Sequence, residues 1–130
     1  MSLKRGCVLA MRSLLAMALG FVVVVLVNQG GGELADLAGF PWGGERRLAW
    51  DLAWVFIAGV LAAWVVTRLA PGASRAHAAV FFMLMLVVAA VAVMQLGGDW
   101  PRWFSAGILL TLPLQMWLGA WWALRGNAQK

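Results

Sequence analysis

The sequence is poor in the residues from which most active sites are built. Among its 130 residues it holds one cysteine, Cys7, and one histidine, His77. A single cysteine excludes an intramolecular disulfide and a cysteine-based metal cluster, and a single histidine excludes bis-histidine haem ligation. Ser-His-Asp, H-E-x-x-H and nucleotide-binding patterns are missing, and the glycines at 30–32 lack the strand and lysine of a phosphate loop. The sequence therefore predicts no enzyme activity and no cofactor.

Charge is also scarce, at 12% of the residues, whereas hydrophobic residues make up 64%. Soluble domains are closer to one quarter charged and one half apolar, and a small domain leaves much of its surface exposed to its solvent. The composition therefore predicts an integral membrane protein. The net charge of +5 does not indicate nucleic-acid binding, because the basic residues stand at the ends of apolar runs. Anionic lipid headgroups are the partners that we expect.

Four continuous apolar runs are each near the roughly 20 residues that a helix needs to cross a bilayer. They cover about 13–28, 48–67, 78–96 and 103–124, with a glycine-containing outer loop at 29–47. The two later connections are short, so consecutive helices should be antiparallel neighbours. The sequence predicts an all-α fold in which residues 1–130 form one transmembrane domain, a four-helix antiparallel bundle.

The first run has the basic start and apolar middle of a signal peptide. The segment that follows it, "NQGGGELADL", offers no A-x-A-like cleavage site. We therefore expect a retained membrane span, and we expect the glycine clusters after it to form flexible turns.

The basic residues predict an orientation, because short cytoplasmic flanks carry an excess of Lys and Arg. With both termini inside, the cytoplasmic flanks would hold Lys4, Arg5, Arg12, Arg68, Arg75, Arg125 and Lys130, and the outer loops only Arg46, Arg47 and Arg102. The acids would all lie on or near the outer side, and these are Glu33, Asp36, Glu45, Asp51 and Asp99. We expect both termini in the cytoplasm of a bacterium, with the chain in the inner membrane.

Tryptophan and small residues fit this arrangement. Indole rings prefer the two membrane interfaces, and the nine tryptophans fall toward the run ends: Trp42, Trp50, Trp54, Trp100 and Trp103 outside, Trp64, Trp117, Trp121 and Trp122 inside. Small residues one turn apart let helices approach closely. Such pairs are Gly59 with Ala63 and Ala16 with Gly20.

Polar side chains within the runs are the candidates for function. Asp51 lies one turn into the second run, with Arg47 four residues earlier, where the two can form an ion pair. The alternative for Asp51 is a carboxylate that handles protons or cations. Gln115 follows Pro113, which frees the carbonyl of Leu109. Gln115 and Thr111 are expected to satisfy that site or to bond a neighbouring helix, and a kink that lines a substrate path is the alternative.

The stretch "RLAPGASRAHA" predicts the turn between the second and third runs. Arg68 complements a helix C-terminus, Pro71 and Gly72 reverse the chain, and Ser74 is expected to cap the next helix. His77 then falls in the first turn of that helix without an assigned role. A remote alternative makes His77 a haem or quinone ligand, with Met83, Met85 or Met116 as its partner.

The stretches "WVVTRLAPGASRAHA", "DWPRWF" and "LLTLPLQMWLGAWWA" together resemble a group of small, uncharacterised bacterial inner-membrane proteins. The pattern is Arg-x-Ala-Pro, then His-Ala, then Pro-x-Trp-Phe, and it covers roughly residues 48–124. The residues that carry it are Arg68, Ala70, Pro71, His77, Ala78, Pro101, Trp103 and Phe104. The resemblance implies a four-span fold and an inner-membrane location, and it implies no activity.

These observations favour a non-enzymatic accessory or structural membrane protein, forming homo-oligomers or bound to a larger membrane complex. The alternative is a small transporter or channel that uses Asp51 and Gln115. A redox subunit that uses His77 is the remote alternative.

Overall fold

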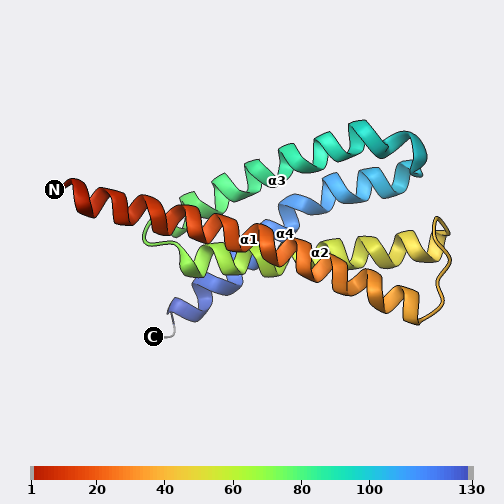
Figure 1. Cartoon of the computed structure of the whole chain (residues 1–130), viewed down its shortest axis with the longest axis horizontal. Coiled ribbons are helices and arrows are strands. Elements are labelled where there is room, and N and C mark those ends of the chain that lie inside the picture. The colour runs from red at the N-terminus through yellow and green to blue at the C-terminus, as the bar shows by residue number, and fades with distance from the viewer. Residues whose placement is uncertain (1, 129–130) are drawn as a thin grey trace.

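The structure, a computed structural model, describes residues 2–128 and consists of four long helices in that part of the chain (Figure 1). In an apolar solvent every backbone polar group must be bonded internally, and a helix achieves this within one segment. All four helices are long and apolar enough to cross a membrane. The predicted all-α bundle with four candidate spans is therefore confirmed. Lys130 lies outside the described residues.

The helices are longer than the apolar runs from which they were predicted. They are α1 (Leu3–Leu37), α2 (Glu45–Leu69), α3 (Ser74–Leu96) and α4 (Arg102–Ala128), with a 3-10 turn at Gly97–Asp99 between the last two. The outer loop predicted at 29–47 is wrong in extent, because residues 29–37 continue α1 and α2 begins at Glu45.

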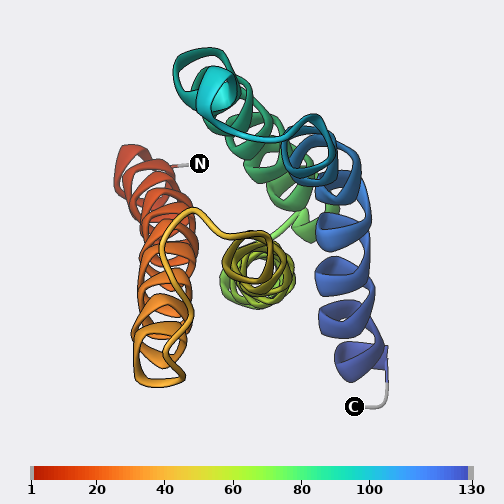
Figure 2. The same ribbon diagram turned by 90° about the vertical axis from the view of Figure 1, so that its right-hand side faces the viewer.

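Helix α2 occupies the centre of the bundle. Figure 2 looks almost along α2, with α1 on one side and α4 on the other, while α3 packs beside α4. Helices α2 and α4 approach closely at Gly119. A Cβ at this position would overlap with the backbone of Val60. The small residues of the two predicted pairs are buried, and these are Ala16, Gly20, Gly59 and Ala63.

The core lies where α2, α3 and α4 meet, and α1 packs against it with partly buried side chains. Its members are buried apolar residues: Ala62, Ala63, Val66, Phe81, Ala89, Leu112 and Met116. Gly20 leaves room at this point, since a Cβ there would lie 2.9 Å from the ring of Phe81. The rings of Phe21 and Phe81 meet edge to face at 5.3 Å. This contact joins α1 to α3, which otherwise touch little.

Glycine ends α1 and starts the reversal into α2. The N–H of Gly39 donates to the carbonyl of Asp36, and that of Phe40 donates to the carbonyl of Ala35, while Gly39 has a φ of +78°. This is the Schellman arrangement that satisfies the last carbonyls of a helix, and it favours glycine at the left-handed position. The Phe40 ring then rests against Trp50 at 5.5 Å.

The turn between α2 and α3 contains Pro71 and Gly72, as predicted, but the cap is different. Ser74 is the first helical residue, and the residue before it, Ala73, has a left-handed backbone with φ 46°. The prediction of Ser74 as the cap is therefore wrong by one position. Because Ala73 turns the chain, the helix begins one residue earlier, and no side chain caps it.

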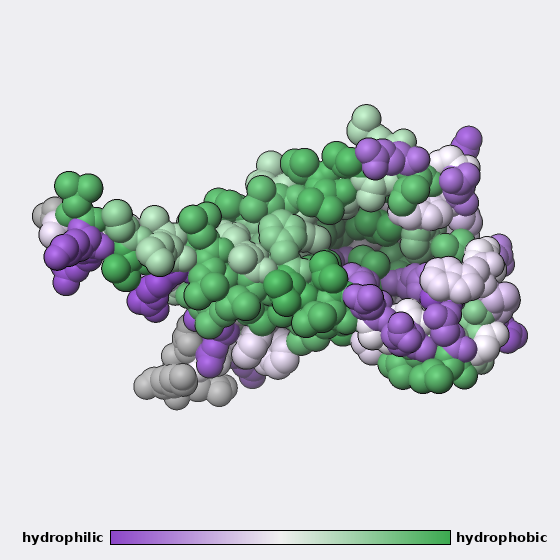
Figure 3. All heavy atoms as spheres, in the orientation of Figure 1, coloured by the Kyte–Doolittle hydropathy of each residue, from purple (hydrophilic) through white to green (hydrophobic). Residues whose placement is uncertain are grey.

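The surface has an apolar band between two polar ends (Figure 3). One end, which we call the acidic end, contains the connection between α1 and α2 and the turn between α3 and α4. The other, the basic end, contains the start of α1, the α2–α3 turn and the end of α4. Many large apolar side chains in the band are exposed, including Val25, Val87 and Leu110.

Candidate functional site

All five acidic residues of the chain lie at the acidic end, together with one buried arginine. Glu33 and Asp36 lie at the end of α1, Glu45 and Asp51 at the start of α2, and Asp99 between α3 and α4. These segments are brought together because α1 and α2 form an antiparallel pair and α3 and α4 another (Figure 1).

Arg47 is the centre of this group, with only 2% of its side chain exposed. Its Nη1 lies 2.7 Å from Asp36 Oδ1, and its Nε lies 3.3 Å from Asp51 Oδ1. Its Nη2 donates to the carbonyl of Gly32 at 3.5 Å, and the ring of Trp42 covers the guanidinium at 3.9 Å. The predicted Arg47–Asp51 pair is therefore confirmed, while the shorter bond to Asp36 was not anticipated because residue 36 was expected in a loop.

The glycines at 30–32 are helical instead of forming the expected flexible turn, and Gly31 and Gly32 make the surface of α1 on which α2 packs. A Cβ at Gly31 would overlap with the indole of Trp54, so only glycine admits that ring. Trp50 Nε1 donates to the Gly31 carbonyl at 2.7 Å. The glycine carbonyls are thus accessible to Trp50 and Arg47, and these contacts offset the low helix propensity of glycine.

Two hollows flank Arg47 at this end. The first, of about 470 Å³, lies between α1 and α2 and is lined by Asn28, Gln29, Gly32, Glu33, Asp36, Trp42, Arg47, Asp51 and Trp54. The second, of about 610 Å³, opens toward the α3–α4 turn and includes Glu45, Asp99 and Trp100. Trp42, Arg47 and Asp51 line both, so the ion pair and the Trp42 ring form the wall that the two hollows share.

The chemistry of the acidic end is that of a compensated ion pair. The carboxylates of Asp36 and Asp51 both bond the Arg47 guanidinium, so its positive charge is compensated within the protein. Within residues 2–128, no group of three or more His, Cys, Asp or Glu side chains is placed to hold a metal ion. The arrangement joins the end of α1 to the start of α2.

Gln115 lies elsewhere, in the middle of the bundle. Only 1% of it is exposed, and its Oε1 presses against Gly59 of α2. Its Nε2 donates to Thr111 Oγ1 at 3.0 Å, and that hydroxyl donates to the Gly107 carbonyl at 2.6 Å. The hydrogen bonds run along α4, so the contact with the neighbouring helix is one of packing. The Leu109 carbonyl is not their acceptor.

Asp51 and Gln115 do not meet. Gly59, which Gln115 contacts, is eight residues after Asp51 on α2, or about 12 Å along a helix axis. One side chain belongs to the acidic end and the other to the packed interior.

His77 links α3 to α1, a contact that the sequence did not suggest. Its Nδ1 lies 3.1 Å from the Ala73 carbonyl, and its Nε2 lies 2.9 Å from the hydroxyl of Ser13. Because a carbonyl only accepts, Nδ1 carries the proton in that bond, and in the neutral ring Nε2 then accepts from Ser13. Both ring nitrogens are engaged, so neither points to a ligand.

Arg68 lies in the last turn of α2, as predicted for a cation at a helix C-terminus. Its guanidinium stands 5.7 Å from the ring of Trp64, and a Cβ on Gly126 of α4 would lie 3.0 Å from its Nη1. The ring of Trp64 lies 5.4 Å from that of Trp122. Arg68 thus belongs to the packing of α2 against α4 at the basic end.

Comparison with protein-family models, curated proteins and solved structures finds no match to this chain. The resemblance to small bacterial inner-membrane proteins stays a prediction from the quoted motifs.

Proposed function

We propose that the chain is an accessory or structural protein of the bacterial inner membrane, without catalytic activity, that works by binding other membrane helices. It sits with both termini in the cytoplasm and the acidic end outside. Its partner is a second copy or a larger membrane complex, and anionic lipids surround its basic end.

The observation that carries this proposal is the contrast between a satisfied interior and unpartnered outer faces. In the part of the chain that the structure describes, every buried side-chain nitrogen and oxygen has a hydrogen-bond partner. The most apolar windows of α1 and α3 are only 11% and 17% buried, against 33% for α2. Faces of this kind contact lipid or another helix, and small residues and good packing decide which.

The ion pair of Asp51 supports this proposal over a transporter. A carrier carboxylate needs access to its ion and freedom to change its charge. Asp51 bonds Arg47 four residues earlier, and Gln115 is enclosed two helical turns away. The two residues that a transporter would use therefore do not share a path.

The test is gentle extraction of the full chain in a mild detergent, followed by native mass spectrometry. A photo-reactive amino acid is placed at the exposed position Val25 or Val87 to report on the outer faces of α1 and α3. The same amino acid at buried Ala62 is the matched control. We expect crosslinks from the two exposed positions to one defined protein, or to a second copy. Recovery of a monomer alone, with crosslinks only to lipid, contradicts the proposal.

A further inference from the structure

Two shallow apolar grooves run along α1 and share one basic residue, Arg12. The larger, of about 490 Å³, is lined by Val8, Met11, Arg12, Leu14, Leu15 and Ala18. The smaller, of about 160 Å³, faces the end of α2 and is lined by Arg12, Leu15, Ala16, Leu19 and Leu69. Leu15 forms the wall between them, so the grooves diverge from the same guanidinium.

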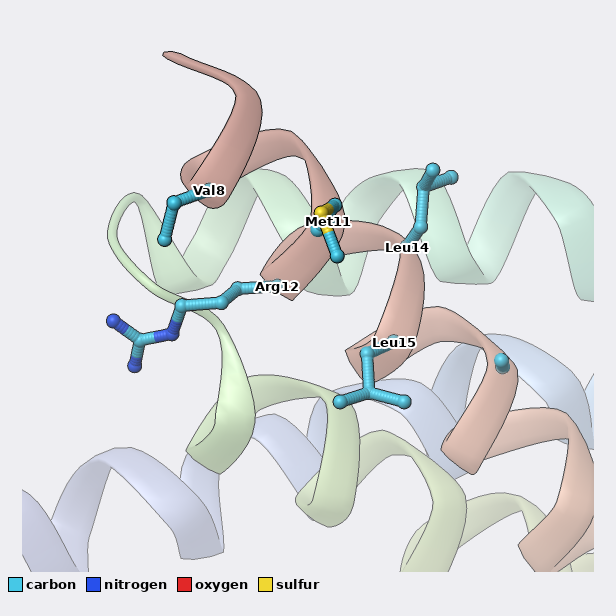
Figure 4. A pocket seen from close by; sticks show the side chains of 6 residues that line it. Val8, Met11, Arg12, Leu14 and Leu15 are labelled. Carbon is cyan, nitrogen blue, oxygen red and sulfur yellow. The ribbon is translucent and has the colours of Figure 1, made fainter. Parts of the chain in front are cut away.

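Figure 4 shows the larger groove from close by. The side chains of Val8, Arg12 and Leu15 follow one another along one side of the helix, while Met11 and Leu14 lie on the other. The lining is almost wholly apolar except for the guanidinium, which extends away from the helix axis. A long cationic side chain at a span end places its stem in hydrocarbon and its charge at the interface.

The charge around Arg12 is of one sign. The described basic residues of this end are Lys4, Arg5, Arg12, Arg68, Arg75 and Arg125, and the five acids all lie at the opposite end. Arg12 is exposed and makes no ion pair with a described acid. Its charge is therefore open to a negative group from outside the chain.

We propose that this face of α1 binds one diacyl phospholipid with an anionic headgroup. The phosphate contacts Arg12, one acyl chain lies along Met11 and Leu14, and the other lies between Leu15 and Leu69. The two grooves correspond to the two acyl chains of one lipid, and the shared guanidinium corresponds to its single headgroup. The site rests on the membrane placement proposed above, and it adds a defined lipid to it.

Native mass spectrometry of the full chain in mild detergent tests this site. The probes are phosphatidylglycerol and phosphatidylcholine with identical chains. We expect retention of the anionic lipid in preference to the zwitterionic one, and Arg12→Gln should lower that retention about fivefold, which corresponds to about 1 kcal/mol for one basic residue at an anionic surface. Arg5→Gln removes the same charge outside both grooves and should change retention by less than about twofold.

A one-chain lysophosphatidylglycerol should be retained several-fold less than the two-chain lipid, because it fills one groove only. Equal retention in the parent and in Arg12→Gln overturns the proposal, and so does an equal loss in Arg5→Gln, since that indicates diffuse charge. A disulfide between two copies of Leu14→Cys in a Cys7→Ala background also overturns it, because a second copy then covers the groove. The crosslinking experiment at Val25 and Val87 tests the proposed function and does not depend on lipid retention. A negative result for the lipid site can therefore be told apart from a negative result for the proposed function.

Discussion

A guanidinium buried in an apolar protein is stable only where its donors are matched, and Arg47 meets that condition through four different partners. Two carboxylates, one glycine carbonyl and one indole face surround it. The ion pair with Asp51 follows from a spacing of four on a helix and is readable in the sequence. The bond to Asp36 is not, because it depends on α1 continuing past Asn28.

Removing the Arg47 charge should destabilise the bundle more than removing any exposed basic residue nearby. Arg47→Gln leaves two carboxylates at the acidic end without their cation, and we expect Tm in detergent to fall by roughly 5 °C or more. Arg46→Gln, at the exposed neighbouring position, should lower Tm by no more than about 1 °C. Similar shifts for both variants, measured by tryptophan fluorescence on heating, contradict the proposed role of Arg47.

His77 and Ser13 are 64 residues apart in sequence, and their hydrogen bond is the polar contact between α1 and α3 that the structure describes. We expect His77→Ala and Ser13→Ala to be coupled by about 0.6 kcal/mol, the average for such bonds in membranes. The measurement is the free energy of unfolding of both single variants and the double variant in mixed detergent micelles. Strict additivity would show that the bond contributes no stability.

At the scale of the helices, the apolar runs predicted four elements and the tight turns predicted which of them are neighbours. Their ends were less predictable. Residues 29–37 contain glycine and charge, which indicate a loop when read alone, but they are helical because Trp50, Trp54 and Arg47 of α2 contact them. Local composition does not contain that information, since the contacts come from residues about 20 positions later.

The glycines of this segment give a matched test. Gly30 and Gly31 are neighbours in α1, but a Cβ at Gly30 has no atom within 4 Å, while one at Gly31 overlaps with Trp54. Gly30→Ala should stabilise the protein by about 0.5 kcal/mol or more through helix propensity. Gly31→Ala should destabilise it, because Trp54 must move and its neighbour Trp50 loses the Gly31 carbonyl. Equal effects of the two substitutions on the free energy of unfolding would contradict a packed helix at this position.

At the scale of the whole molecule, the length of α1 is informative. Its 35 residues extend over about 50 Å, whereas a hydrocarbon core is about 30 Å thick. Its N-terminal end projects beyond the other helices in Figure 1, and its C-terminal turns pack on α2 at the acidic end. The basic end, the acidic end and the apolar band between them are the features that predict how the chain sits in a membrane.

We propose that the chain crosses the membrane with its basic end in the cytoplasm and its acidic end outside. Labelling of spheroplasts with a membrane-impermeant maleimide tests it most directly, because exposed Cys7 reports on the basic end. Ala38→Cys in a Cys7→Ala background reports on the exposed connection between α1 and α2. We expect the Ala38→Cys thiol to be labelled in intact spheroplasts, and the Cys7 thiol only after the membrane is permeabilised. Labelling of Cys7 in intact spheroplasts, or protection of both thiols until permeabilisation, would contradict this orientation.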